Sequence, residues 1–101
     1  MEFEWHEEKR RTNIAKHGVD FTDAIQVFRG PHLVEDRTRP EDGETRKGAI
    51  GPLPTDVVPD HWSGNLIVVV YTRREGTIRI ISARRADTDE RRRYESQVGG
   101  R

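Results

Sequence analysis

Arginine side chains collect along one predicted strand in the second half of the chain, where their type and spacing suit the binding of phosphate. The strand and the residues after it read Ile78-Arg79-Ile80-Ile81-Ser82-Ala83-Arg84-Arg85-Ala86. A guanidinium group holds rigid, planar donors that match two phosphate oxygens at once. The run therefore predicts a phosphate-binding surface. The alternatives are a cross-strand ion pair for Arg79 and, for Arg84 and Arg85, capping of the sheet edge or pairing with Glu90.

A second polar group lies on the first predicted helix. Lys9 is followed after four, seven and eight residues by Asn13, Lys16 and His17. These spacings place the four side chains on one helical face. The face carries two ammonium groups, an amide and an imidazole, a combination that attracts anions. The alternatives are a solvated helix face and, for His17, a cation that stabilises the negative end of the helix dipole.

Tyr94 follows Glu90 by four residues on the last predicted helix. Its phenol could transfer a proton or stack on a nucleobase. The alternative is an amphipathic residue that packs the helix onto the sheet.

Charge is distributed unevenly, although the chain has 18 basic and 18 acidic residues. Residues 1–60 hold nine Lys/Arg and thirteen Asp/Glu, whereas residues 61–101 hold nine Arg and five Asp/Glu. The first part is therefore acidic and the second basic, which can mark a nucleic-acid surface or a surface of mixed ion pairs. With 32% hydrophobic residues the core must be thin, and a partner could supply part of the stability.

Composition excludes several classes of protein. The chain has no cysteine, so disulfides and thiolate metal sites are absent. No apolar stretch approaches the roughly 18–20 residues that span a bilayer, and the first residues do not resemble a signal peptide, so we expect a cytoplasmic protein without membrane contact. The four histidines lack the spacing of metal ligands, and the basic side chains would repel a cation. We expect no metal and no cofactor.

Two helices are predicted in the first third of the chain. Phe3 and Trp5 alternate with glutamates as in a short strand. The first helix should run from Glu7 to about Lys16 and end at Gly18. Asp20 should cap a second helix that ends at Gly30-Pro31. The apolar face of that helix comprises Phe21, Ala24, Ile25 and Phe28.

Strands dominate the remainder. We expect them at 33–34, 45–50, 66–71 and 77–83, the last two as a hairpin. Alternation should place Ile78, Ile80 and Ser82 on one sheet face and Arg79, Ile81 and Ala83 on the other. Residues 51–64 predict an irregular, proline-rich loop, and a capping box of Asp87 and Glu90 begins the last helix before a frayed tail at 97–101. The fold class is α+β: one domain over 1–101 with two N-terminal helices, an antiparallel sheet of about four strands and a C-terminal helix.

Two sequence blocks together carry a family pattern. The first is Trp5-x-x-x-Lys9-x-x-x-Asn13-x-x-Lys16-His17-Gly18-Val19-x-Phe21-x-x-Ala24-x-x-Val27-Phe28. The second is Arg79-Ile80-Ile81-Ser82-Ala83-Arg84-x-Ala86, followed by Glu90-x-x-x-Tyr94. The pattern, from about residue 2 to residue 95, closely resembles the BrnT family, toxins of type II toxin–antitoxin systems with a RelE-like fold.

This resemblance implies an activity and partners. It implies an endoribonuclease that blocks translation by cutting mRNA, on or off the ribosome, without a metal ion. It also implies a cognate BrnA-like antitoxin with a ribbon-helix-helix DNA-binding part. The complex would regulate its own operon, so that operator DNA is contacted only through the antitoxin.

The chain departs from the family pattern at two places. Family members usually carry Asp where this chain has His6, so the service of that carboxylate, capping of the first helix, is lost or provided differently. The loop at 52–64 is also longer and richer in proline than is usual. If it closes over the basic face, it alters access of the substrate.

The candidate residues agree with metal-free RNA cleavage. Attack by a ribose 2′-OH on the adjacent phosphate needs a base for the hydroxyl and an acid for the leaving 5′-oxygen. His17, Lys9 and Tyr94 are the candidates for proton transfer, and their roles remain open among them. If His17 is the base, the rate should rise with pH through roughly 6–7.

The same reaction needs positive charge beside the developing phosphorane. Arg79 and Arg84 are the candidates for this role, and Asn13, Lys16 and Arg85 are expected to contact RNA. Two other functions fit the same residues. One is a non-catalytic module that binds RNA or the ribosome, and the other is a partner that only holds a DNA-binding antitoxin.

Overall fold

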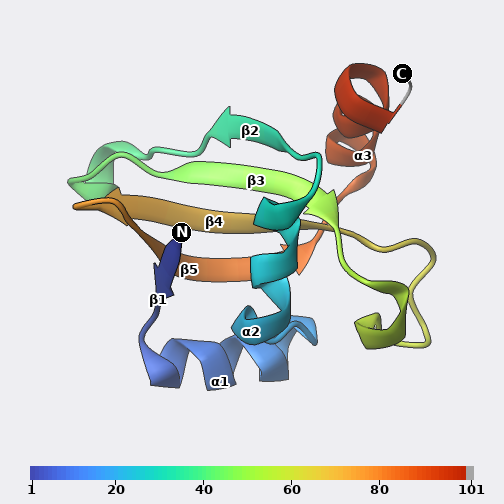
Figure 1. Ribbon diagram of the computed structural model, residues 1–101, viewed down its shortest axis with the longest axis horizontal. Helices are drawn as coiled ribbons and strands as arrows, with labels where there is room; N and C mark the ends of the chain where they lie inside the picture. The colour runs from blue at the N-terminus through green and yellow to red at the C-terminus, as the bar shows by residue number, and fades with distance from the viewer. Residues whose placement is uncertain (100–101) are drawn as a thin grey trace.

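The computed structural model describes residues 1–99, which form a mixed β-sheet with helices against it (Figure 1). The sheet order is β1-β5-β4-β3-β2, and its residue ranges are β1 Glu2–Glu4, β2 Leu33–Asp36, β3 Lys47–Pro52, β4 Leu66–Arg74 and β5 Thr77–Arg85. Strands β2 to β5 are antiparallel neighbours, whereas β1 pairs in parallel with the start of β5. The α+β class is confirmed, but five strands replace the four expected. The fifth is the three-residue opening segment, whose partner lies some seventy residues further along the chain.

Helix α1 spans Glu7–His17 and lies along β5 (Figure 1). Glu7 and Glu8 stand at the positive end of its dipole, and Gly18 ends it in the left-handed region with φ of 73°. His6 is the N-cap residue, and within residues 1–99 its side chain makes no capping hydrogen bond.

The second predicted helix is divided. Helix α2 covers Phe21–Ala24, capped by the Asp20 carboxylate, which accepts a hydrogen bond from the Thr22 N–H, and a 3₁₀ helix follows at Ile25–Arg29. Phe21, Ala24 and Val27 are fully buried. Because residues three apart align in a 3₁₀ helix, this spacing lets the tighter segment continue one buried stripe.

A β-bulge changes which side chains of β5 face the core. Val70 pairs with Ser82 but Tyr71 pairs with Ile80, so Ile81 is an extra residue. As a result Ala83 joins Ile78 and Ile80 on the buried face, each at most 1% exposed. The alternation expected from the sequence was therefore wrong beyond Ile81, because one inserted residue reverses the faces of all that follow.

The sheet separates two apolar clusters. The larger lies on the α2 side and includes Phe21, Ile67 and Ile80, whereas a smaller one includes Ile50, Val68 and Tyr94 on the α3 side. Helix α3, Thr88–Tyr94, begins with the predicted capping box of Asp87 and Glu90.

The C-terminal end differs from the expected frayed tail. A π-helical turn at Glu95–Gly99 continues α3, and Val98 packs against the smaller cluster. Residues 100–101 of the expected tail lie outside the described residues.

The connection between β3 and β4 has more order than expected. Residues 51–52 complete β3, and Thr55–Val57 forms a 3₁₀ turn. The N–H of Leu53 donates to the Asn65 carbonyl at 2.9 Å, and the Asn65 amide donates back to the Leu53 carbonyl at 2.7 Å. The larger cluster also packs against Val57, Val58 and Trp62. The segment is therefore held by the Leu53–Asn65 hydrogen bonds where it leaves the sheet and by apolar contacts between them. Across residues 1–99, none of the helices has the length and apolar character needed to cross a membrane.

Candidate functional site

Asn13 joins α1 to the edge of β5. Its amide nitrogen donates to the carbonyls of Val19 and Ala83 at 2.9 and 2.7 Å, and its amide oxygen accepts from the Ala83 N–H at 3.1 Å. The residue is only 5% exposed. Asn13 thus supplies the hydrogen bonds that a neighbouring strand would otherwise make, and it holds the basic face of the helix at a fixed distance from β5.

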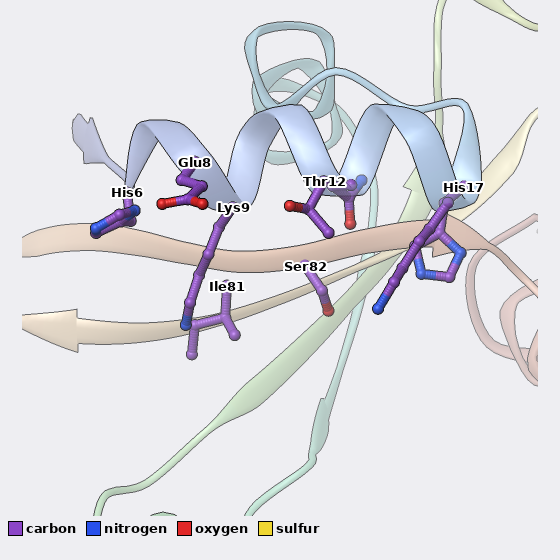
Figure 2. A pocket seen from close by; sticks show the side chains of 9 residues that line it. His6, Glu8, Lys9, Thr12, His17, Ile81 and Ser82 are labelled. Atoms are coloured by element: carbon purple, nitrogen blue, oxygen red, sulfur yellow. The ribbon is translucent and has the colours of Figure 1, made fainter.

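An open cavity of about 480 Å³ lies between α1 and β5 (Figure 2). We call it the α1 groove, lined by His6, Glu8, Lys9, Thr12, Asn13, Lys16, His17, Ile81 and Ser82. Lys9 extends from the helix towards Ile81, and His17 lies at the opposite end of the groove (Figure 2). All four residues predicted on this helix face therefore line one cavity. Glu8 adds a carboxylate that the predicted stripe did not contain.

A second cavity of about 450 Å³ begins where the groove ends. We call it the loop pocket, lined by Ile14, Ala15, Lys16, His17, Gly18, His61, Trp62, Arg84 and Arg85. Lys16 and His17 belong to both cavities, so the two are continuous around the end of α1. Within the described chain, the lining of this pocket holds cations and imidazoles and no carboxylate. The pocket gathers four of the predicted residues, Lys16, His17, Arg84 and Arg85.

Arg84 is held by the buried carboxylate of Glu90. Its two terminal nitrogens donate to the two Glu90 oxygens at 2.8 and 2.9 Å, and Arg37 donates to the same carboxylate at 2.8 Å. Burial would raise the pKa of Glu90, but these hydrogen bonds and one from the Asp87 N–H outweigh it and lower that pKa to about 2. The ion pair with Glu90, a sequence alternative for Arg84, is present. It also orients the guanidinium at the pocket wall.

Arg85 is positioned by the connection between β3 and β4. One terminal nitrogen donates to the Ser63 carbonyl at 3.3 Å and to the Ser63 hydroxyl at 3.1 Å. The guanidinium carbon stands 5.7 Å from the centre of the Trp62 ring, within cation–π range.

Two predicted residues lie away from both cavities. Arg79 donates to Glu4 of β1 at 2.7 Å, the cross-strand ion pair that was its alternative. Tyr94 is 8% exposed, and its hydroxyl donates to the Pro31 carbonyl at 3.3 Å, so it packs α3 onto the sheet. The structure does not bring either side chain to the loop pocket.

His61 and Trp62 were missed by sequence reasoning. They lie in the proline-rich segment, where no period of apolar residues predicts the path of the backbone. The dipeptide itself carries a signal, since an imidazole is able to transfer a proton and an indole is able to stack on a base.

A third hollow, of about 310 Å³, opens on the α3 side of the sheet. It is lined by Arg37, Arg39, Arg46, Val70, Ile81 and Ser82. Arg37 lies across Gly48, where a Cβ would stand only 2.9 Å from its Cγ. Among the described residues, the Nε of Arg46 is a buried donor without a partner.

No group of three His, Cys, Asp or Glu side chains in residues 1–99 could hold a metal ion.

Comparison with known proteins decides the family. The family model of the ribonuclease toxin BrnT of type II toxin–antitoxin systems matches residues 5–90. The chain belongs to the BrnT family. A search of curated proteins found no significant match.

The BrnT assignment is supported by a solved structure. The crystal structure of the Brucella abortus ribonuclease toxin BrnT shares 30% sequence identity, with a TM-score of 0.59, over 87% of this chain and 99% of that one. As a BrnT toxin of a type II system, the chain is a ribonuclease toxin with an antitoxin as its partner. The BrnT match includes every residue of the α1 groove and of the loop pocket, whereas Tyr94 follows its end.

Proposed function

We propose that the chain is a metal-independent endoribonuclease that cuts mRNA and thereby stops translation, and that its site is the loop pocket with the adjoining α1 groove. The observation that carries the proposal is the meeting of Lys16, His17 and Arg84 around a cavity whose described lining contains no carboxylate. Such a cavity attracts the phosphate backbone of RNA. It repels a metal ion, since its imidazoles stand beside three cationic side chains.

The lining residues supply the base, the acid and the positive charge that 2′-OH attack requires. His17 and His61 are two imidazoles on one cavity, so one can take the hydroxyl proton while the other protonates the leaving 5′-oxygen. The guanidinium of Arg84, oriented by Glu90, stabilises the charge of the phosphorane. Lys9 and Lys16 bind the backbone of the strand along the α1 groove. Arg79 and Tyr94 are not part of the site that we propose.

The partner that we propose is a BrnA-like antitoxin with a ribbon-helix-helix DNA-binding part. The family membership supports it, since toxins of type II systems are held by a protein antitoxin. The toxin would then reach operator DNA only through this partner.

Purified protein and a labelled single-stranded RNA, with excess chelator present, test the activity. We expect cleavage that leaves a 2′,3′-cyclic phosphate and a 5′-hydroxyl, the products of 2′-OH attack. His17→Asn should slow cleavage on the order of 10²–10⁴-fold. His17 is exposed, so this change does not disturb the core.

Expression without an antitoxin tests the consequence in cells. Wild type should arrest growth and create new mRNA 5′ ends, and His17→Asn should do neither. Arg92→Gln is the control, because Arg92 is exposed on α3 and lies outside both cavities. Growth arrest without new mRNA ends would favour a non-catalytic RNA- or ribosome-binding module. Normal growth with folded protein would favour a pure antitoxin-binding role.

A further inference from the structure

Phosphate binding does not account for the residues Trp62 and Arg85 on one side of the loop pocket. Phosphate binding needs cations but not an indole ring. Trp62 is half-buried against the larger core cluster and also lines the pocket, so its position is fixed by packing. The guanidinium of Arg85 lies over this ring and is tied at one edge to Ser63.

This arrangement holds a planar group in a defined orientation. Among residues 1–99, Arg85 makes no ion pair with a carboxylate, in contrast to Arg84, which is bound to Glu90. The indole and Ser63 therefore position the Arg85 guanidinium, while the side chain as a whole remains exposed. A guanidinium plane held in this way can stack on an unpaired nucleobase, as aromatic rings do.

The neighbouring groups match the rest of a nucleotide. Lys16 and Arg84 lie on the same pocket and can bind the phosphates on either side of the base. His61 adds ring nitrogens that can donate to or accept from the base edge. A volume of about 450 Å³ is within the range of small-molecule sites, so one nucleotide can enter.

We propose that Arg85, supported by Trp62, is a stacking platform that binds one unpaired base of the RNA strand and thereby contributes to the choice of the cleavage site. The proposal rests on the proposed function for the identity of the ligand, single-stranded RNA.

Binding is measured with oligonucleotides that the protein cannot cleave. A fluorescently labelled 2′-O-methyl strand lacks the attacking hydroxyl, so its anisotropy reports affinity whether or not the protein is a nuclease. Arg85→Lys keeps the charge but removes the plane, and Trp62→Leu removes the support. Each should weaken binding roughly 5- to 100-fold, the range found for loss of one stacked base. Arg92→Lys, the same change at an exposed site on α3, is the control and should leave affinity unchanged.

An abasic scan identifies stacking directly. A series of strands is used, each of which lacks one base at a different position. At one position, removal of the base should weaken binding to wild type. The same removal should cause no further loss of affinity in Arg85→Lys. Trp62→Phe, which keeps a ring, should restore most of the affinity lost in Trp62→Leu and shows that the loss is not due to misfolding. Adenosine 5′-monophosphate should bind at least tenfold more weakly than the strand.

The outcomes separate the two proposals. We call the loss of the abasic effect in Arg85→Lys position-specific coupling. Such coupling without RNA cleavage would support the stacking platform and refute the nuclease activity. Cleavage by wild type with no coupling at any position, and with Arg85→Lys binding as tightly as Arg92→Lys, would overturn the platform alone. Equal affinity for the mononucleotide and the strand would also overturn it, because the site would then take free nucleotides.

Discussion

The hydroxyl of Tyr94 donates to the carbonyl of Pro31, while its ring packs among Ile50 and Val68 beneath α3. We infer that a residue used in this way contributes to stability and takes no part in proton transfer. Tyr94→Phe should therefore leave the rate of RNA cleavage unchanged and lower the free energy of unfolding by about 0.5–1.5 kcal/mol, the net value of one hydrogen bond.

Single-turnover cleavage and urea denaturation of the purified variant measure the two quantities. Tyr71→Phe, which removes the other phenol of the chain from the opposite core cluster, controls for loss of a hydroxyl. A cleavage defect on the order of 10²-fold in folded Tyr94→Phe would return Tyr94 to the catalytic group.

At this scale, residue type and spacing predicted about half of the residues that line the loop pocket. Lys16, His17, Arg84 and Arg85 could be identified because each stands at the end of a strongly patterned element. His61 and Trp62 could not, because the path of an irregular segment depends on distant packing and not on local period. Arg79 was predicted to lie in the site, but it pairs with Glu4, which becomes its neighbour only when β1 joins the sheet.

At the scale of elements, the attachment of α1 to β5 depends on one amide. Asn13→Ala would leave the carbonyls of Val19 and Ala83 without a donor and the Ala83 N–H without an acceptor. We expect a loss of about 2–4 kcal/mol in the free energy of unfolding, since each abandoned buried group costs about 1–3 kcal/mol and water reaches some of them.

The midpoint of urea denaturation checks this value. Thr12→Ala, an exposed neighbour on the same helix, is the control and should change stability by less than about 0.5 kcal/mol. Equal effects of the two substitutions would show that the amide does not anchor the helix.

The elements differed in how well sequence predicted them. Gly18 and the Asp87–Glu90 capping box carry local signals, and both mark helix ends in the structure. The bulge at Ile81 carries none, because its cause is the register between two strands. Asn13 was expected to contact RNA from an exposed helix face, but the helix buries it against β5, where its amide bonds to the backbone of Val19 and Ala83.

At the scale of the whole molecule, Glu90 ties α3 to both β5 and the segment after β2 through Arg84 and Arg37. Its pKa in the folded chain, about 2, is below the ordinary value of 4.5. The folded state therefore favours the ionised carboxylate, and this stabilisation is complete above about pH 5 and is lost as pH falls towards 2. The loss amounts to about 3 kcal/mol over that interval.

Thermal or urea unfolding at a series of pH values between 2 and 7 measures the effect. Glu90→Gln should be less stable than wild type at pH 7 and should show a weaker dependence on pH. Asp89→Asn, at a carboxylate that is 79% exposed, should retain the wild-type pH dependence. A Glu90→Gln profile parallel to that of wild type would contradict the prediction.

The long-range pairings of this sheet also have a consequence for synthesis of the protein. Glu2–Glu4 pairs with the first residues of β5, and Asn13 bonds to Ala83. A ribosome makes the N-terminal end first, so a nascent chain carries the lysines of α1 long before the strand that completes their cavities exists. A chain that ends before β5 lacks both the anchor of the helix and the arginines of the loop pocket. With the site that we propose, a truncated product that ends before β5 would be unable to cut RNA and would not harm the cell that makes it.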